Sequence, residues 1–241
     1  MPQKLNSIWV GFLIFVANSN PFRMGFDKMK NSAYFTVKLI CNCAAVFLLL
    51  LFSSCTSTET KLPYLGNPVV KESETIFPKI AEFTFTNQDQ AIITNKTFEN
   101  KIYVADFIFL SCPTICPKMT SEMKSVYEIY KGNSKVAFLS HTIDPENDTI
   151  EKLKLYAQSM NLNSNWHFVT GNKEDILEIA EKSYFTTAYS DANEPGGFVH
   201  GGGFVLVDDK GHIRGVYDGT NSTETKRLIA DIKILLKELK A

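Results

Sequence analysis

The chain has 241 residues, of which 44% are hydrophobic and 21% charged, and its formal net charge is −1 at pH 7. This composition suits one globular domain with an appendage. It argues against a nucleic-acid partner, because the chain has no Lys/Arg-rich run and near-neutral charge gives no long-range attraction for phosphate.

The N-terminal quarter contains two apolar runs, although an export signal needs only one. We interpret residues 1–28 as an upstream extension of the reading frame, with Met29 as the natural start. Residues 29–54 then have the order of an export signal, in which lysines precede an apolar core at 39–52. This core is shorter than the roughly 20 apolar residues that are needed to cross a membrane.

The stretch "FSSCTSTETK" follows the apolar core, with small residues before Cys55 and a polar, Ser/Thr-rich segment after it. It resembles a bacterial lipoprotein signal, in which Cys55 would receive the lipid, although Phe52 stands where leucine is usual. An uncleaved signal anchor is the alternative. In either case we expect a polar linker at 55–78 and a domain at 79–241 that is exported and tethered to the membrane.

Export changes the interpretation of the cysteines. Cys41 and Cys43 lie in the signal and Cys55 is the predicted lipid site, so the exported domain keeps only Cys112 and Cys116. A single pair of cysteines in an oxidising compartment is expected to close as a disulfide unless a reductant or a metal intervenes.

The exported domain alternates strand and helix patterns. A strand is predicted at 80–87, a buried central strand at 101–110 and a helix from Pro117 to Lys131, which has apolar residues at three- and four-residue spacings. The later elements are a strand at 135–143, a helix at 149–160, a strand at 166–171, a helix at 173–184, a hairpin at 202–219 and a helix at 224–240. This order predicts a thioredoxin-like fold, an α/β architecture with a mixed central sheet flanked by helices.

The motif "SCPTICP" (111–117) directly follows the predicted central strand. Cys112 is thus expected at the start of a helix, where unpaired N–H groups and the helix dipole favour a thiolate. With three residues between them, Cys112 and Cys116 can face each other across one turn, near enough for a disulfide or for joint ligation of one metal. A redox dithiol, part of a metal site and an inert disulfide all remain open.

A soft metal on two thiolates needs at least one more ligand, and the candidates are the four histidines and the methionines. His200 lies in "VHGGGFVLVDD", directly before the predicted hairpin strand. In a thioredoxin-like fold the loop that enters this strand faces the cysteines, so His200 is the preferred candidate. His167 in a strand and His212 in the hairpin are interpreted as structural, and His141 beside the "TIDP" turn is ambiguous.

The exported domain resembles the Sco/SenC family in four successive segments: "DFIFLSCPTICPKM" (106–119), "TIDPENDTIEKLKLYA" (142–157), "WHFVTG" (166–171) and "VHGGGFVLVDDKGHIRGVYDG" (199–219). The resemblance implies a membrane-tethered thioredoxin-like metallochaperone in the bacterial cell envelope, with its domain outside the cytoplasm. Such a protein binds one copper ion, as Cu(I), Cu(II) or both, and helps to assemble the binuclear copper centre of cytochrome c oxidase. Its expected partners are the copper-centre subunit of that oxidase and a thiol reductant.

The resemblance also implies the site residues. Carried over by position, the copper ligands are Cys112, Cys116 and His200, and Asp144 matches an acidic residue near the site. The family pattern has a small apolar residue or valine near His141, so a contribution of this histidine to the metal site is left open.

Two alternatives use the same cysteines. A thiol-disulfide oxidoreductase would keep a partner's cysteines reduced, with His200 acting only as a nearby base or hydrogen-bond donor. A peroxiredoxin-like peroxidase is less well supported, because Phe109 occupies the position of the Thr or Ser that precedes the reactive cysteine by three residues.

Overall fold

A computed structural model of the protein describes residues 61–162, 165–191 and 198–240. The predicted extension, the export signal and the lipid site at Cys55 lie outside these residues. Within the three described stretches, no helix is both long enough and apolar enough to cross a membrane.

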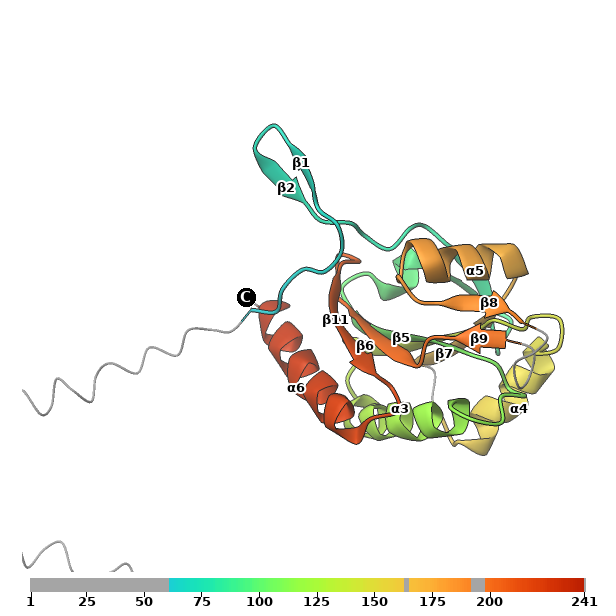
Figure 1. The fold of residues 1–241 in the computed structure, drawn as a ribbon. Coiled ribbons are helices and arrows are strands. Elements are labelled where there is room, and N and C mark those ends of the chain that lie inside the picture. The colour runs from blue at the N-terminus through green and yellow to red at the C-terminus, as the bar shows by residue number, and fades with distance from the viewer. Residues whose placement is uncertain (1–60, 163–164, 192–197, 241) are drawn as a thin grey trace, which may run out of the picture. The chain divides into compact units, whose positions relative to one another are not determined.

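A seven-stranded mixed sheet forms the centre of the domain (Figure 1). In spatial order its strands are β11 (Ile213–Asp218), β10 (Gly203–Val207), β5 (Ile102–Ile108), β6 (Val136–Thr142), β7 (Trp166–Thr170), β3 (Thr84–Asn87) and β4 (Ile92–Thr94). Strands β5, β6 and β7 run parallel, and the other neighbouring pairs are antiparallel. Two small antiparallel sheets pair β1 (Val69–Lys71) with β2 (Glu74–Ile76) and β8 (Ala188–Ser190) with β9 (Phe198–His200).

Helices cover both faces of the central sheet. Figure 1 shows α3 (Cys116–Tyr130), α4 (Ile150–Ser159) and α6 (Ser222–Glu238) on one face and α5 (Lys173–Lys182) on the other, and a short 3₁₀ helix, η1 (Asn95–Phe98), follows β4. Helices α4, α5 and α6 begin at side-chain caps, in which an oxygen of Thr149, Asn172 or Asn221 accepts a backbone N–H of the first turn. Helix α3 has no such cap and begins at Cys116.

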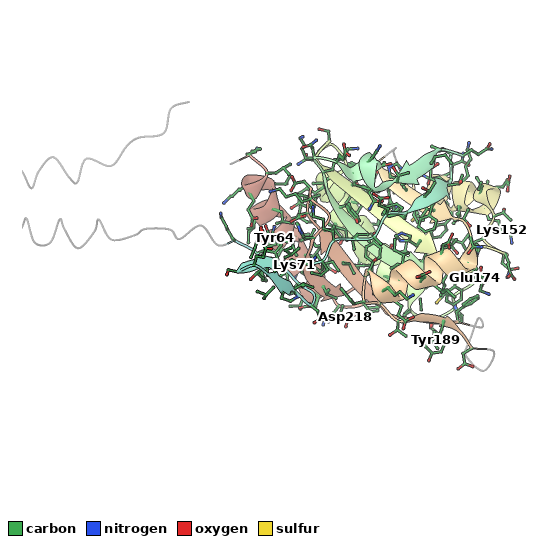
Figure 2. The ribbon with its side chains drawn as sticks, turned by 90° about the horizontal axis from the view of Figure 1, so that it is seen from above. Tyr64, Lys71, Lys152, Glu174, Tyr189 and Asp218 are labelled. Carbon is green, nitrogen blue, oxygen red and sulfur yellow. The ribbon has the colours of Figure 1, made fainter. Side chains whose placement is uncertain are left out.

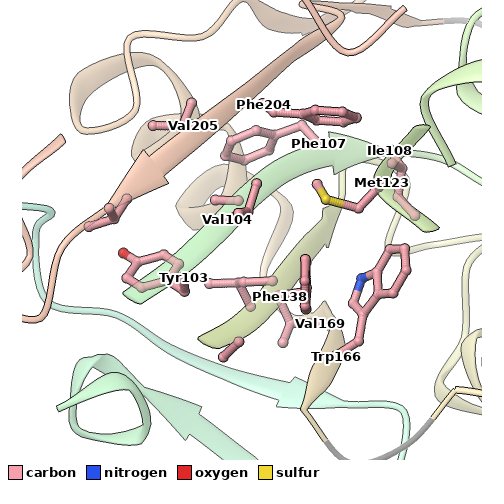
Figure 3. Packing of buried hydrophobic residues seen from close by; sticks show 14 of the residues in the cluster. Tyr103, Val104, Phe107, Ile108, Met123, Phe138, Trp166, Val169, Phe204 and Val205 are labelled. Carbon is pink, nitrogen blue, oxygen red and sulfur yellow. The ribbon is translucent and has the colours of Figure 1, made fainter. Parts of the chain in front are cut away.

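The core explains why the central strands have continuous apolar sequences. Every residue of β5 and β6 is buried, since both faces of these strands are covered by helices. On one face the ring of Phe107 stacks on His141 of β6, and on the other Met123 of α3 lies beside Ile108 (Figure 3). The predicted elements from the central strand to the last helix are confirmed in their order, and β8 and β9, which were not predicted, come between α5 and β10.

The predicted strand at 80–87 is shorter than expected, because β3 begins only at Thr84. Before it, side chains satisfy the backbone: Phe83 N–H donates to Oδ1 of Asn95 at 2.9 Å, and Ala81 N–H donates to Oγ of Ser183 at 3.2 Å. Side-chain acceptors therefore replace a neighbouring strand along this segment.

The first described residues are fixed to the domain by Arg214 of β11. Its guanidinium donates to the carbonyls of Leu62, at 2.6 Å, and Pro63, at 3.2 Å. It also donates to the carboxylates of Asp208, at 3.1 Å, and Glu238, at 2.9 Å. Arg214 is only 4% exposed, so this is a buried network that joins the predicted linker to the hairpin and to α6.

The described chain begins at one end of the domain. In Figure 2, Tyr64 and Lys71 lie at one end, and Lys152 of α4, Glu174 of α5 and Tyr189 of β8 lie at the other. Helices α4 and α5 begin where the parallel strands β6 and β7 end. The chain therefore enters the domain at the end opposite to the carboxyl edge of the parallel strands.

Candidate functional site

The two cysteines lie at the carboxyl edge of the parallel strands. Cys112 is in the turn that follows β5, and Cys116 is the first residue of α3. Their exposed fractions are 7% and 5%, although Ser111, Pro113 and Thr114 of the same turn are exposed. Both cysteines are thiols, and their side chains share a hydrogen bond. The two sulfur atoms are thus within reach of one disulfide or one metal ion.

Burial raises the pKa of the Cys116 thiol above its ordinary value. The hydrogen bond with Cys112 and the charge of Asp106 raise this pKa further, whereas a backbone hydrogen bond with Phe109 lowers it. Burial at Cys116 thus opposes the effect of the helix start, and the thiolate expected at Cys112 stays a prediction.

An acidic turn at 143–149 follows β6 and lies beside the cysteine turn, because β5 and β6 are parallel neighbours. The link between the two turns is Asp148, which the sequence did not single out: its Oδ2 accepts the Leu110 N–H at 3.0 Å and the Thr142 hydroxyl at 2.5 Å. The predicted residue Asp144 is also buried, but its carboxylate accepts from Asn147 within its own turn.

Asp148→Ala is expected to lower the free energy of unfolding by about 1–3 kcal/mol, because it leaves the buried Thr142 hydroxyl and the half-buried Leu110 N–H without their acceptor. Asp148→Asn keeps an acceptor oxygen and should lose less. Denaturant unfolding measures both changes. Asp144→Ala is the matched comparison, and a loss from it that equals that of Asp148→Ala would contradict the assignment of Asp148 as the link between the turns.

His200 ends β9, where its backbone pairs with Ala188, and its side chain lies outside the described residues. The chain on both sides of it lies against the cysteine segment. Two residues later, a Cβ placed on Gly202 would be 3.6 Å from Cδ1 of Ile115. Two residues earlier, the ring centroid of Phe198 is 5.3 Å from that of Phe109. Among the described side chains, no three histidines, cysteines or carboxylates gather as a metal site.

His141 is fully buried in β6, away from the cysteines. Its ring stacks on Phe107 at 4.7 Å and meets the edges of Phe85 and Tyr184. Its Nδ1 lies 3.4 Å from the carbonyl oxygen of Asp106, and its Nε2 has no hydrogen-bond partner among the residues that the structure describes. The structure therefore packs His141 among aromatic rings and does not bring it to the predicted metal site.

The other two histidines make local contacts. His167, in β7, has Nδ1 3.1 Å from the side-chain amide nitrogen of Asn87. His212, at the end of the hairpin turn, has Nδ1 3.4 Å from a carboxylate oxygen of Asp208. Neither contact involves the cysteine turn.

His141→Phe is expected to reduce the loss of stability on acidification. Burial lowers the pKa of His141 from 6.5 to about 4, so the unfolded chain takes up this proton first as the pH falls. The stability linked to the neutral ring is complete above pH 6.5 and is lost between pH 6.5 and pH 4, on the order of 3 kcal/mol. Denaturant unfolding of both proteins at pH 7 and pH 4.5 measures the change. An equal loss in wild type and variant would contradict it.

Taken together, a helix-flanked mixed sheet and two thiols at the junction of a central strand and the next helix define a thioredoxin-like dithiol protein. The SCO1/SenC family model matches residues 72–237, and the chain belongs to this family.

Solved structures agree with this assignment. A SCO1/SenC family lipoprotein from Bacillus anthracis has 34% sequence identity and a TM-score of 0.61, over 66% of this chain and 95% of that one. BsSco, a member of the Sco family of cytochrome c oxidase assembly proteins with a disulfide switch, has 31% identity and a TM-score of 0.60, over 73% and 98%. Bradyrhizobium japonicum ScoI with copper bound shares the fold, with a TM-score of 0.56 at 23% identity, over 66% and 99%. The predicted fold and family are confirmed.

Proposed function

We propose that this protein binds one copper ion through Cys112, Cys116 and His200 and helps to assemble the copper centre of cytochrome c oxidase. The observation that carries the proposal is the meeting of two neighbouring thiols with the chain segment of His200, which lies against Ile115 and Phe109. Two thiolates and an imidazole suit the soft ion Cu(I). The relatives support the same function, since BsSco is an oxidase assembly protein and B. japonicum ScoI holds copper.

The chemistry of the thiols makes copper binding depend on pH and on redox state. Cys112 and Cys116 bind copper as thiolates, so uptake by the reduced protein releases protons and weakens as the pH falls. Closing the disulfide removes two protons and two electrons from the pair and with them both sulfur ligands. A thiol reductant must return the protons and electrons before copper can bind again.

A thiol-disulfide oxidoreductase is the second candidate, because the hydrogen bond between the two cysteine side chains places them within reach of a disulfide. Both functions need the thiolate, so the raised pKa of Cys116 does not separate them. Copper carriage is favoured because the chain segment of His200 lies against the cysteine segment, which a disulfide alone would not need.

We further propose that a lipid on Cys55 tethers the domain to the outer side of a membrane. The B. anthracis relative is a lipoprotein, which supports this attachment. The described chain enters the domain at the end opposite to the cysteine turn (Figure 2). This arrangement leaves the cysteine edge free to meet an oxidase subunit.

A competition titration of the reduced protein with Cu(I) and a chelator of known affinity tests the copper ligands. We expect one copper per chain in the wild type and at least about a 10-fold loss of affinity in His200→Ala, given that even outer-shell changes cost metal sites 10- to 100-fold. His212→Gln, which changes a histidine of the hairpin, should bind as the wild type does. A wild type without stoichiometric copper, or a His200→Ala variant of unchanged affinity, would refute the proposal. An oxidoreductase would instead keep its reductase activity in His200→Ala.

A further inference from the structure

The ring of Phe198 connects β9 to two other segments of the site. Phe198 begins β9, two residues before His200. Its ring centroid lies 5.3 Å from that of Phe109, and the Nζ of Lys173 lies 5.1 Å from the same Phe198 centroid. Phe109 follows β5 and Lys173 begins α5, so one aromatic side chain joins three parts of the fold.

Phe109 connects the ring of Phe198 with the cysteine turn. Phe109 is 1% exposed, and its carbonyl oxygen accepts the N–H of Cys112 at 3.2 Å. The residue against which Phe198 packs is therefore the one that holds the backbone of Cys112. A shift of either ring changes the distance between β9 and the cysteine turn.

The contact with Lys173 leads to the acidic turn. The Nζ of Lys173 is 4.0 Å from Oε1 of Glu146, in the same turn as Asp144 and Asp148. Asp148 in turn accepts the N–H of Leu110 in the cysteine segment. The ring of Phe198 thus lies where the cysteine turn, the acidic turn and β9 meet.

The backbone alone holds β9 weakly. Strands β8 and β9 have three residues each. Among the residues that the structure describes, β9 pairs only with β8, and the bond from Gly201 N–H to the Thr187 carbonyl at 2.7 Å extends this pairing. An isolated two-stranded sheet is marginally stable in water. Further contacts are needed to fix β9 against the cysteine turn, and the ring of Phe198 makes two of them.

We infer that Phe198 is a positioning residue, which holds position 200 next to the cysteine turn. The inference rests on the proposed function, in which His200 is a copper ligand. Residues two apart in a strand share a face, so positions 198 and 200 belong to the same face of β9. Phe198 acts through the placement of β9 and is not itself a ligand.

The test compares Phe198→Ala with Phe198→Tyr, which keeps the ring, and with Tyr189→Ala. Tyr189 lies in β8 opposite Val199 and is 49% exposed, so its removal is the matched loss of an aromatic ring from the same two-stranded sheet. The first measurement is amide hydrogen exchange of the reduced, copper-free protein. In Phe198→Ala the Gly201 N–H is expected to exchange at least about 10-fold faster than in the wild type, whereas Phe198→Tyr and Tyr189→Ala should leave it unchanged.

The second measurement is Cu(I) affinity together with the imidazole signal in X-ray absorption. Phe198→Ala is expected to lose about 10-fold in affinity and part of the imidazole signal, with both thiolate ligands kept. Phe198→Tyr should restore both. Lys173→Met removes only one contact of the Phe198 ring, so it should lower the Cu(I) affinity and the imidazole signal by less than Phe198→Ala does. If Phe198→Ala does not fold, Lys173→Met tests the positioning role by the same measurements.

The outcomes distinguish the positioning role of Phe198 from the proposed copper-binding function. Unchanged exchange at Gly201 in Phe198→Ala, or an equal effect of Tyr189→Ala, would overturn the positioning role. Faster exchange at Gly201 in a protein whose wild type binds no copper would uphold that role and refute the proposed function.

Discussion

Cys116→Ser is expected to abolish stoichiometric Cu(I) binding by the reduced protein, and Cys112→Ser is expected to do the same. A serine hydroxyl is a hard donor that stays protonated, whereas soft Cu(I) prefers thiolate. Since outer-shell changes already cost 10- to 100-fold, the loss of a direct ligand should exceed about 100-fold. Oxidising the wild type to the disulfide should give the same loss without a substitution, and a thiol reductant should reverse it.

Cys55→Ser is the matched cysteine substitution for this experiment. It should keep one copper per chain and lose the lipid, which mass measurement of the mature protein and its release from membranes would show. Retention of tight copper binding by either Cys112→Ser or Cys116→Ser would mean that the proposed site is wrong. Loss of copper in Cys55→Ser would mean that its assigned role is wrong.

The central strands and α3 were predictable from local pattern. Residues 101–110 and 135–143 are continuously apolar and β-prone because β5 and β6 are covered on both faces, so burial alone produces the signal. The apolar residues of 117–131 recur at helical spacing because one side of α3 is packed on the sheet. The place of the cysteines at the strand–helix junction follows directly from these two elements.

The electrostatics of the site were not predictable in this way. The helix start is visible in the sequence, but the burial that raises the pKa of Cys116 is a property of the assembled turns. Asp144 and Asp148 belong to the same acidic turn, and only Asp144 was singled out from the sequence. Only the folded chain shows that Asp148 is the residue that reaches Leu110.

The contacts of the N-terminal segment were also not predictable from the sequence. Composition predicts a polar linker over 55–78, and within it the structure packs Leu62 and Leu65 against the core and ties the backbone to Arg214. These contacts join residues about 150 positions apart, and no local pattern encodes such a pairing. Arg214 itself looks like an ordinary hairpin residue in the sequence.

Arg214→Met is expected to lower the free energy of unfolding by about 3–5 kcal/mol, because it leaves the carboxylates of Asp208 and Glu238 buried without their cation. Asp208 is 5% exposed and Glu238 19%, so water cannot replace the guanidinium. The bonds to the carbonyls of Leu62 and Pro63 are lost as well, which should release the first described residues. Denaturant unfolding measures the loss, and the melting temperature should fall by roughly 2–4 °C for each kcal/mol.

Arg227→Ala is the control, because Arg227 also lies between two carboxylates, those of Glu224 and Asp231, but is 45% exposed. An exposed ion pair contributes at most about 1 kcal/mol, so this loss should be several times smaller than that of Arg214→Met. Equal losses would show that the buried network is not a special source of stability. Since Arg214 lies at the end of the domain opposite to the cysteine turn, folded Arg214→Met should still bind copper as the wild type does, which separates stabilisation of the domain from ligation of the metal.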